Sequence, residues 1–329
     1  MFSRFINRLM FASCVLAFTP IAFAQQAASA QRYPERSIRW VVPAPPGANN
    51  DIFARLVAQH LSKALGQPVV IDNRPGAGSI VGADIVAKSP PDGYTILMTP
   101  SSIAITDAMY KQLPYNTVKD FTGVAMLAEQ PLVVVVKPTA GIATLKDLIA
   151  RAKAKPGTLN YGSGGIGTPQ HLATEMFKGL AGVDIVHVAY KGSTGAITDL
   201  LASHIDFMIE PAATVIPHVM NGSLRALAVT TPARSSLIPD VPTAVEAGLP
   251  GFVLKAWYGV LTRAGTPRPI VDRLGTEISS IVRMPDVQQA FAKQGATTVV
   301  SSPREFDEFI RSEIKTWGKL VKDANVTVN

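Results

Sequence analysis

The chain has 329 residues, of which 47% are hydrophobic and 17% charged, which is enough apolar material for the cores of about two domains. Its formal net charge is +7 without any Lys/Arg-rich run, so a nucleic-acid partner, which needs a clustered basic face, is not expected. The only cysteine is Cys14, which excludes an internal disulfide.

Residues 1–24 have the pattern of a secretory signal peptide. Arg4 and Arg8 form a basic n-region, and the apolar run 9–23 is too short to cross a bilayer comfortably. The small-x-small sequence at 22–24 predicts cleavage after Ala24, against the alternative of an uncleaved anchor. Loss of the two arginines would leave a net charge of +5 on an exported protein.

The first unit after this segment reads as strand, tight loop and helix N-terminus. The β-rich run 38–42 stops at prolines, which cannot extend a central strand, and Gly47 allows a turn. Asn49, Asn50 and Asp51 are N-cap residue types that precede apolar residues at helical spacing. Free N–H groups at a helix N-terminus bind anions, so we expect this loop to hold one side of a carboxylate ligand, against the alternative of an ordinary turn. The candidate residues are Pro46, Gly47, Ala48, Asn49, Asn50 and Asp51.

Alternating strands and helices then predict an open, largely parallel sheet. In the first half, strands are expected at 68–71, 94–98, 121–127 and 132–136, and a second helix at 80–88. The third strand ends near Ser101, which is a further candidate ligand-binding residue. The sequence Glu129-Gln130-Pro131 is expected to break the next strand. We interpret that break as a crossing into a second domain.

The second half continues the alternation. Helices are expected at 145–154, 169–180, 194–204, 216–220, 270–283 and 306–324, and strands at 158–161, 183–190, 206–209, 224–230, 253–261 and 297–300. A second crossing near Lys255 gives a discontinuous domain, 31–128 with 255–329, and an inserted domain, 129–254. A ligand is expected in the cleft between them, where strand-end loops meet.

A glycine-rich loop with the pattern Gly162-x-Gly164-x-x-Gly167 follows one of these strands. It fits the dinucleotide fingerprint, but that fingerprint needs an acid at the end of the next strand. Asp184 stands at the start of that strand, so no nucleotide cofactor is expected. Glycine backbone and the hydroxyls of Ser163 and Thr168 can instead approach a smaller ligand, with a packing turn as the alternative.

Other polar residues fall near the same predicted edge. Tyr190, Lys191 and Gly192 follow a strand and precede a helix, although a solvated lysine is the alternative for Lys191. Asp206 and Glu210 bracket a short strand; a structural role is favoured for Asp206, and Glu210 stays open.

Motifs of metal and covalent catalysis are missing. The sequence has neither H-E-x-x-H nor a phosphate loop, and Ser163 lacks the Gly-x-Ser-x-Gly context because position 161 is Tyr. His171, one turn into the glycine-loop helix, can line the cleft. The remaining enzyme alternative is an exported hydrolase that uses Ser163 with His171.

Taken together, the motifs resemble the Bug-type substrate-binding proteins of tripartite tricarboxylate transporters over nearly the whole mature chain. They include Val42-Pro43-x-Pro45-Pro46-Gly47 with Asp51, Asn73-Arg74-Pro75-Gly76-Ala77-Gly78, Pro91-Asp92-Gly93-Tyr94-Thr95, Leu159-Asn160-Tyr161-Gly162-Ser163, Val188-x-Tyr190-Lys191-Gly192 and Asp240-Val241-Pro242-Thr243.

The resemblance implies a periplasmic protein with an α/β, bilobed type II periplasmic-binding-protein fold, in which two mixed or parallel-sheet domains are joined by two crossover strands. It implies a receptor without catalysis or cofactor that binds a small organic carboxylate, dicarboxylates included. The ligand loops of the family match Pro46–Asp51 and Tyr161–His171, which adds Tyr161, Gly164 and Gly165 to the candidates. The implied partner is a permease with a large and a small subunit, with a signalling receptor as the alternative; a monomer is expected.

The chain departs from the family pattern around this site. Ala48, Asn49 and Asn50 replace the usual glycine and small residues, and Ile209, Glu210 and Pro211 replace a phenylalanine and an Asp-Asn pair. The identity of the ligand therefore does not transfer from any relative.

Overall fold

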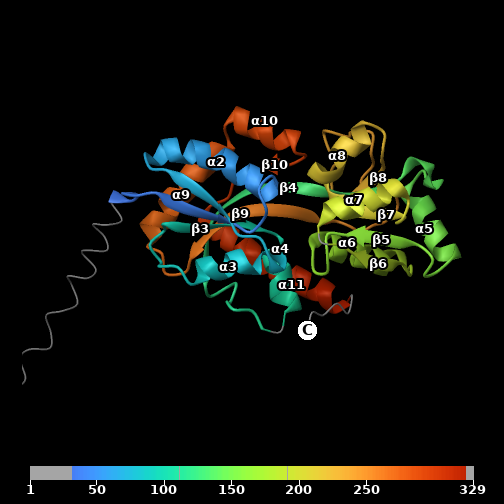
Figure 1. Ribbon diagram of the computed structural model, residues 1–329, viewed down its shortest axis with the longest axis horizontal. Coiled ribbons are helices and arrows are strands. Elements are labelled where there is room, and N and C mark those ends of the chain that lie inside the picture. The colour runs from blue at the N-terminus through green and yellow to red at the C-terminus, as the bar shows by residue number, and fades with distance from the viewer. Residues whose placement is uncertain (1–31, 111, 191, 324–329) are drawn as a thin grey trace, which may run out of the picture.

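The computed structural model describes residues 32–110, 112–190 and 192–323, so the predicted signal peptide lies outside the described residues. Figure 1 shows an elongated, bilobed α/β molecule. The strands form one mixed sheet in the order β2-β1-β3-β9-β4-β7-β5-β6, with β8 and β10 each paired to β4. Within the described part of the chain, no helix is long and apolar enough to cross a membrane.

The first lobe is the end of the molecule that contains the N-terminal strands (Figure 1). Its elements are β1 (Ile38–Val42), α2 (Asn49–Leu65), β2 (Val69–Asn73), η1 (Ala77–Ser79), α3 (Ile80–Ala87), β3 (Thr95–Pro100), α4 (Ser102–Met109), α9 (Arg268–Val282), α10 (Pro285–Lys293) and β10 (Thr297–Thr298). The final helix, α11 (Pro303–Asp323), packs on α4 and β4.

The second lobe is the opposite end, built around a parallel group of strands. Its elements are η2 (Pro138–Ala140), α5 (Leu145–Ala154), β5 (Asn160–Ser163), α6 (Pro169–Ala181), β6 (Val186–Ala189), α7 (Ser193–Ala202), β7 (Phe207–Pro211), α8 (Ala212–Met220) and β8 (Arg225–Val229).

Two long antiparallel strands, β4 (Phe121–Val136) and β9 (Lys255–Arg263), run through the middle of the sheet. The expected break of β4 at 129–131 is wrong, because the strand is continuous over 16 residues. Pro131 is the last residue paired with β9, and Leu132 is the first paired with β7. A proline, which has no N–H to donate, is tolerated at this change of neighbours.

Close packing fixes the final helix against this central pair. Gly259 of β9 has no Cβ, and a Cβ there would lie 2.1 Å from the ring of Phe306. The indole N–H groups of Trp257 and Trp317 both donate to Glu313, at 2.7 and 2.9 Å. Helix α11 therefore holds the strands on which the two lobes meet.

Two helices were not expected from the sequence. Six of the eight residues of α4 are buried, so the helix shows no polar face from which its period could be recognised. Helix α10 has nine residues and begins at Pro285, directly after α9 ends. A short helix so close to another is hard to separate from its neighbour by periodicity alone.

Candidate functional site

The loop between β1 and α2 is shaped by Asp51, which is only 3% exposed. The N–H of Gly47 donates to Asp51 Oδ2 at 2.9 Å, and Arg55 Nε donates to the same oxygen at 2.9 Å. Ala48 is the N-cap, so Asp51 acts from the third helical position instead. The N–H of Ala48 donates to Pro45 O at 3.3 Å, so two loop amides are taken by the chain itself. The first-turn amides of α2 have no partner within the helix.

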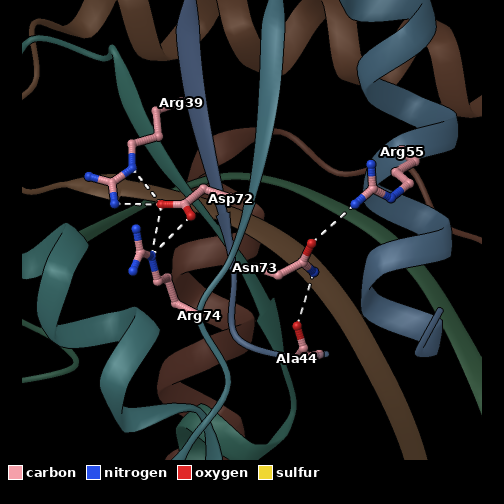
Figure 2. Close-up of polar contacts among 6 residues, drawn as sticks. All are labelled: Arg39, Ala44, Arg55, Asp72, Asn73 and Arg74. Carbon is pink, nitrogen blue, oxygen red and sulfur yellow. Dashed lines mark hydrogen bonds and ion pairs between the residues drawn. The ribbon is translucent and has the colours of Figure 1, made fainter. Parts of the chain in front are cut away.

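A polar network behind this loop fixes its position (Figure 2). Asn73 Nδ2 donates to Ala44 O at 3.0 Å and to Asp51 Oδ1 at 2.9 Å, and Asn73 Oδ1 accepts from Arg55 at 3.1 Å. Burial opposes the ionisation of Asp51, but hydrogen bonds from Arg55, Gly47 and Asn73 outweigh it and lower its pKa. Asp51 is therefore an anion that keeps Arg55 occupied.

In a separate cluster next to this network, Asp72 accepts hydrogen bonds from Arg39 Nε at 2.8 Å and Arg74 Nε at 3.0 Å (Figure 2). The pKa of Asp72 is lowered by these two arginines despite its partial burial, which opposes the shift. Within the Asn73-Arg74 motif, Asn73 therefore supports the loop directly, and Arg74 pairs with Asp72 of β2.

The glycine loop of the second lobe runs from Ser163 to Thr168. Thr168 caps α6 by accepting from His171 N at 3.4 Å, and the N–H of Gly167 donates to His171 Nδ1 at 3.2 Å. A Cβ on Gly167 would lie 2.9 Å from Met109 Sδ in α4, so this loop touches the first lobe. The backbone of the glycine loop packs here against a methionine side chain of the first lobe.

Ser163 is fully buried and belongs to a Ser–His pair, but not the expected one. Its Oγ lies 2.7 Å from His187 Nε2, whereas the hydrolase alternative needed His171. His187 stacks on His171 and Tyr161, with ring centroids 4.2 and 4.7 Å apart. Burial lowers the pKa of His171, and burial with the neighbouring His171 lowers that of His187 to about 4, so both rings are neutral at pH 7.

Glu210 lies just behind the glycine loop and is 0% exposed. Its Oε2 accepts from Ser193 Oγ at 2.8 Å and from Gln170 Nε2 at 3.2 Å, and burial raises its pKa to about 7. Gln170 and Ser193 were missed as site residues. The available signal was their place in the first turn of the two helices that follow predicted ligand loops.

Tyr258 of β9 lies beside the first-lobe loop. Its hydroxyl accepts from Gln130 Nε2 and also interacts with the side chain of Asn49. Burial raises the pKa of Tyr258 to about 12, the hydrogen bonds of Asn49 and Gln130 oppose this, and the charge of Glu210 adds to it. Neither Tyr258 nor Gln130 was predicted, because both lie inside apolar strands.

Several predicted side chains are bound within their own lobe. The hydroxyls of Tyr161 and Tyr190 donate to Glu175 at 2.7 Å and Asp199 at 2.6 Å, respectively. Asp206 accepts from the N–H of Asn160, at the opposite end of β5 from Ser163, which agrees with the structural role favoured for it.

The other predicted residues differ in their relation to the glycine loop. Gly192, at φ +111°, donates its N–H to Gly164 O at 3.1 Å and so lies beside that loop. Ser101 is buried at the start of α4, where its N–H donates to Trp257 O at 3.0 Å. Lys191 lies outside the described residues. Among the residues that the structure covers, there is no cluster of His, Cys, Asp or Glu side chains that could hold a metal ion.

The buried carboxyl of Glu210 should make stability depend on pH. Its pKa is about 7 when folded against 4.5 for the free group, so the unfolded chain ionises first as pH rises. The neutral form of Glu210 makes its full contribution to the free energy of unfolding below pH 4.5. This contribution is lost as the pH rises to 7, and the loss amounts to up to about 3 kcal/mol.

We therefore expect the free energy of unfolding of the wild type, minus that of Glu210→Gln, to fall between pH 4.5 and 7. Urea titrations of both ligand-free proteins measure this difference. His187, whose pKa is lowered, acts in the opposite direction over a similar range, but it is common to both proteins and cancels. A difference that stays constant with pH would contradict the raised pKa.

Comparison with known proteins gives the family. Residues 53–326 match the family described as the tripartite tricarboxylate transporter family receptor, TctC. Protein BugT of Bordetella pertussis is 40% identical over 297 residues, which cover 90% of this chain and 91% of BugT.

Two solved structures from Rhodopseudomonas palustris are similar over most of their length. Rpa4515 with adipate has a TM-score of 0.83 and 34% identity, covering 90% of this chain and 99% of that one. MatC with bound malate has a TM-score of 0.79 and 31% identity, covering 88% and 100%. The resemblance expected from the motifs is thus confirmed, and with it the bilobed fold. The chain belongs to the TctC family of periplasmic solute-binding receptors, as a Bug-type binding protein and not an enzyme.

Proposed function

We propose that this protein captures a small organic carboxylate between the loop Pro46–Asp51 and the loop Ser163–Thr168, and delivers it to a tripartite tricarboxylate-type permease. The observation that carries the proposal is that each loop ends in the N-terminus of a long helix, α2 or α6. Such termini bind anions through free N–H groups and the helix dipole. Related structures that hold adipate and malate support the ligand class.

The mode of binding follows from how the charged groups are used. Arg55, the cation next to the first loop, is already bound to Asp51 and Asn73. The ligand carboxylate is therefore held by main-chain amides, by the amide side chains of Asn49 and Asn50, and by small hydroxyls. Hydrogen bonds to a charged group contribute about 1.5–3 kcal/mol each, so a few of them are sufficient.

The proposal includes export, closure and delivery. Residues 1–24 would be removed during export. The monomeric protein would then close residues 129–254 onto residues 31–128 and 255–329, by bending where β4 and β9 pass from one lobe to the other. The N-terminal residues Leu9 to Phe23 supply the export signal. Chemical cross-linking of the ligand-loaded protein in its native membranes tests delivery: permease subunits support transport, and a sensor protein supports the signalling alternative.

Ser163→Ala is expected to weaken carboxylate binding by about tenfold, since it removes a hydroxyl worth one charged hydrogen bond. The same change releases His187 Nε2 and Gly165 N–H, which Ser163 holds. Mass spectrometry of the co-purified ligand and a thermal-shift screen of carboxylates identify the probe, and calorimetry measures its affinity. Ser280→Ala, on the exposed side of α9, is the control. Equal affinities in the wild type and Ser163→Ala would remove this hydroxyl from the site.

A further inference from the structure

Glu210 occupies, from inside the protein, the kind of position that an anionic ligand group would take. Its carboxylate is bound by Ser193, the first residue of α7, and by Gln170, in the first turn of α6. The positive ends of both helix dipoles favour a negative charge there. Part of the anion-binding capacity of the second lobe is therefore already used by the chain's own acid.

This acid lies close to the second of the two proposed ligand loops. A Cβ on Gly164 would lie 3.3 Å from Ser193 Oγ and 3.7 Å from Gln170 Nε2, so one layer of side chains separates Glu210 from the glycine loop. The charge of Glu210 also raises the pKa of Tyr258, whose hydroxyl interacts with Asn49 of the first loop. A ligand between the loops would lie within the field of this carboxylate.

The surroundings of Glu210 contain more acceptors than donors. Over the described part of the chain, no donor is found for the buried oxygen atoms Glu210 Oε1, Gln170 Oε1 and Gln130 Oε1. Glu210 and Gln130 are 0% and 1% exposed, so water does not readily satisfy them. A buried region rich in unpaired acceptors disfavours an anion and favours a hydrogen-bond donor.

We propose that Glu210 determines specificity by favouring a carboxylate ligand whose remote end is a hydrogen-bond donor, an ammonium above all, over a dicarboxylate of the same length. The inference rests on the proposed function, because it assigns the chemistry of the second end of the same ligand. The ammonium compensates the negative charge of Glu210, and a second carboxylate would be repelled by it.

The test compares matched ligands at pH 8, where Glu210 is ionised. Calorimetry measures adipate against 6-aminohexanoate and succinate against 4-aminobutanoate, with the hydroxy acids of the same lengths between them. Of the two chain lengths, one is expected to fit the site. At that length, the wild type should bind the amino acid at least about tenfold more tightly than the dicarboxylate. In Glu210→Gln this preference should fall by about tenfold, because the affinity for the dicarboxylate rises and the affinity for the amino acid falls.

Two further variants make the result specific. Glu308→Gln removes the same charge from an exposed ion pair on α11 and should keep the wild-type preference. Glu210→Met, of similar volume and without charge, should repeat the effect of Glu210→Gln, and thermal melts establish that each variant is folded. The dependence on Glu210 would then come from its charge.

The possible failures are distinguishable. A wild type that binds the dicarboxylate as tightly as the matched amino acid, or a preference that survives in both Glu210 variants, would overturn the inference and leave carboxylate capture intact. A wild type that binds no carboxylate at all would overturn the proposed function and the inference together.

Discussion

Replacing Asp51 with alanine is expected to weaken ligand binding by about a hundredfold and to lower the free energy of unfolding by about 3 kcal/mol. The carboxylate is almost fully buried and joins three groups: Gly47 N–H, Arg55 and Asn73. Its removal leaves these donors unpaired and frees the loop that we propose holds the ligand. Urea titration and calorimetry of the purified variant measure both effects.

Two variants separate the shape of the loop from its charge. Asp51→Asn keeps an acceptor for Gly47 but loses the ion pair, so it should retain most of the affinity that Asp51→Ala loses. Asp272→Ala breaks an Arg–Asp pair at the same helical spacing on the exposed face of α9, and should change stability by less than about 1 kcal/mol. If Asp51→Ala behaved like Asp272→Ala, Asp51 would not organise the loop.

Gly47→Val is the second change with a large expected effect. Gly47 has φ +82°, and no heavy atom lies within 4 Å of where its Cβ would be, so space is not the obstacle. The left-handed backbone costs an ordinary residue about 1–2 kcal/mol, and a β-branched one resists it more. The valine should push the loop out of this conformation and reduce ligand affinity by about tenfold or more.

Gly66→Val is the matched control at the other end of the same helix. Gly66 has φ +68° and an equally open Cβ position, but it is the C-cap of α2 and far along the chain from the loop. Both variants should lose similar stability, as measured by urea titration, and only Gly47→Val should lose affinity. Equal affinities in the two variants would show that the loop conformation does not matter for binding.

Local chemistry made the first ligand loop predictable. Prolines after β1, a glycine at positive φ and a polar helix start are local signals that predict the turn. The cap itself differs from the prediction, because Ala48 is the N-cap and Asn49, Asn50 and Asp51 lie in the first turn of α2. Local signals also predict α5, whose expected range, 145–154, coincides with the structure. There Thr144 and Asp147 form a capping box, a signal contained in four residues.

Tertiary contacts decided what the sequence could not. Whether Pro131 breaks a strand depends on which neighbours β4 has on each side, and those neighbours come from distant segments. The partner of Ser163 is His187, because β5 and β6 pair in parallel register. Periodicity along one segment carries no information on such pairings.

The same limit applies to Glu210, whose role stayed open in the sequence. Only the fold shows that α6 and α7 begin beside it. The motifs did show that this position departs from the family pattern. The fold gives the physical consequence of that departure. It is a buried charge next to the site, and not a surface substitution.

A crystal structure of the protein with its co-purified ligand tests the central claim most directly. We expect an acid group of the ligand to be bound to first-turn amides of α2, with the glycine loop Ser163–Thr168 on its opposite side. A ligand that lies away from both loops, or that has no acid group at all, would contradict it.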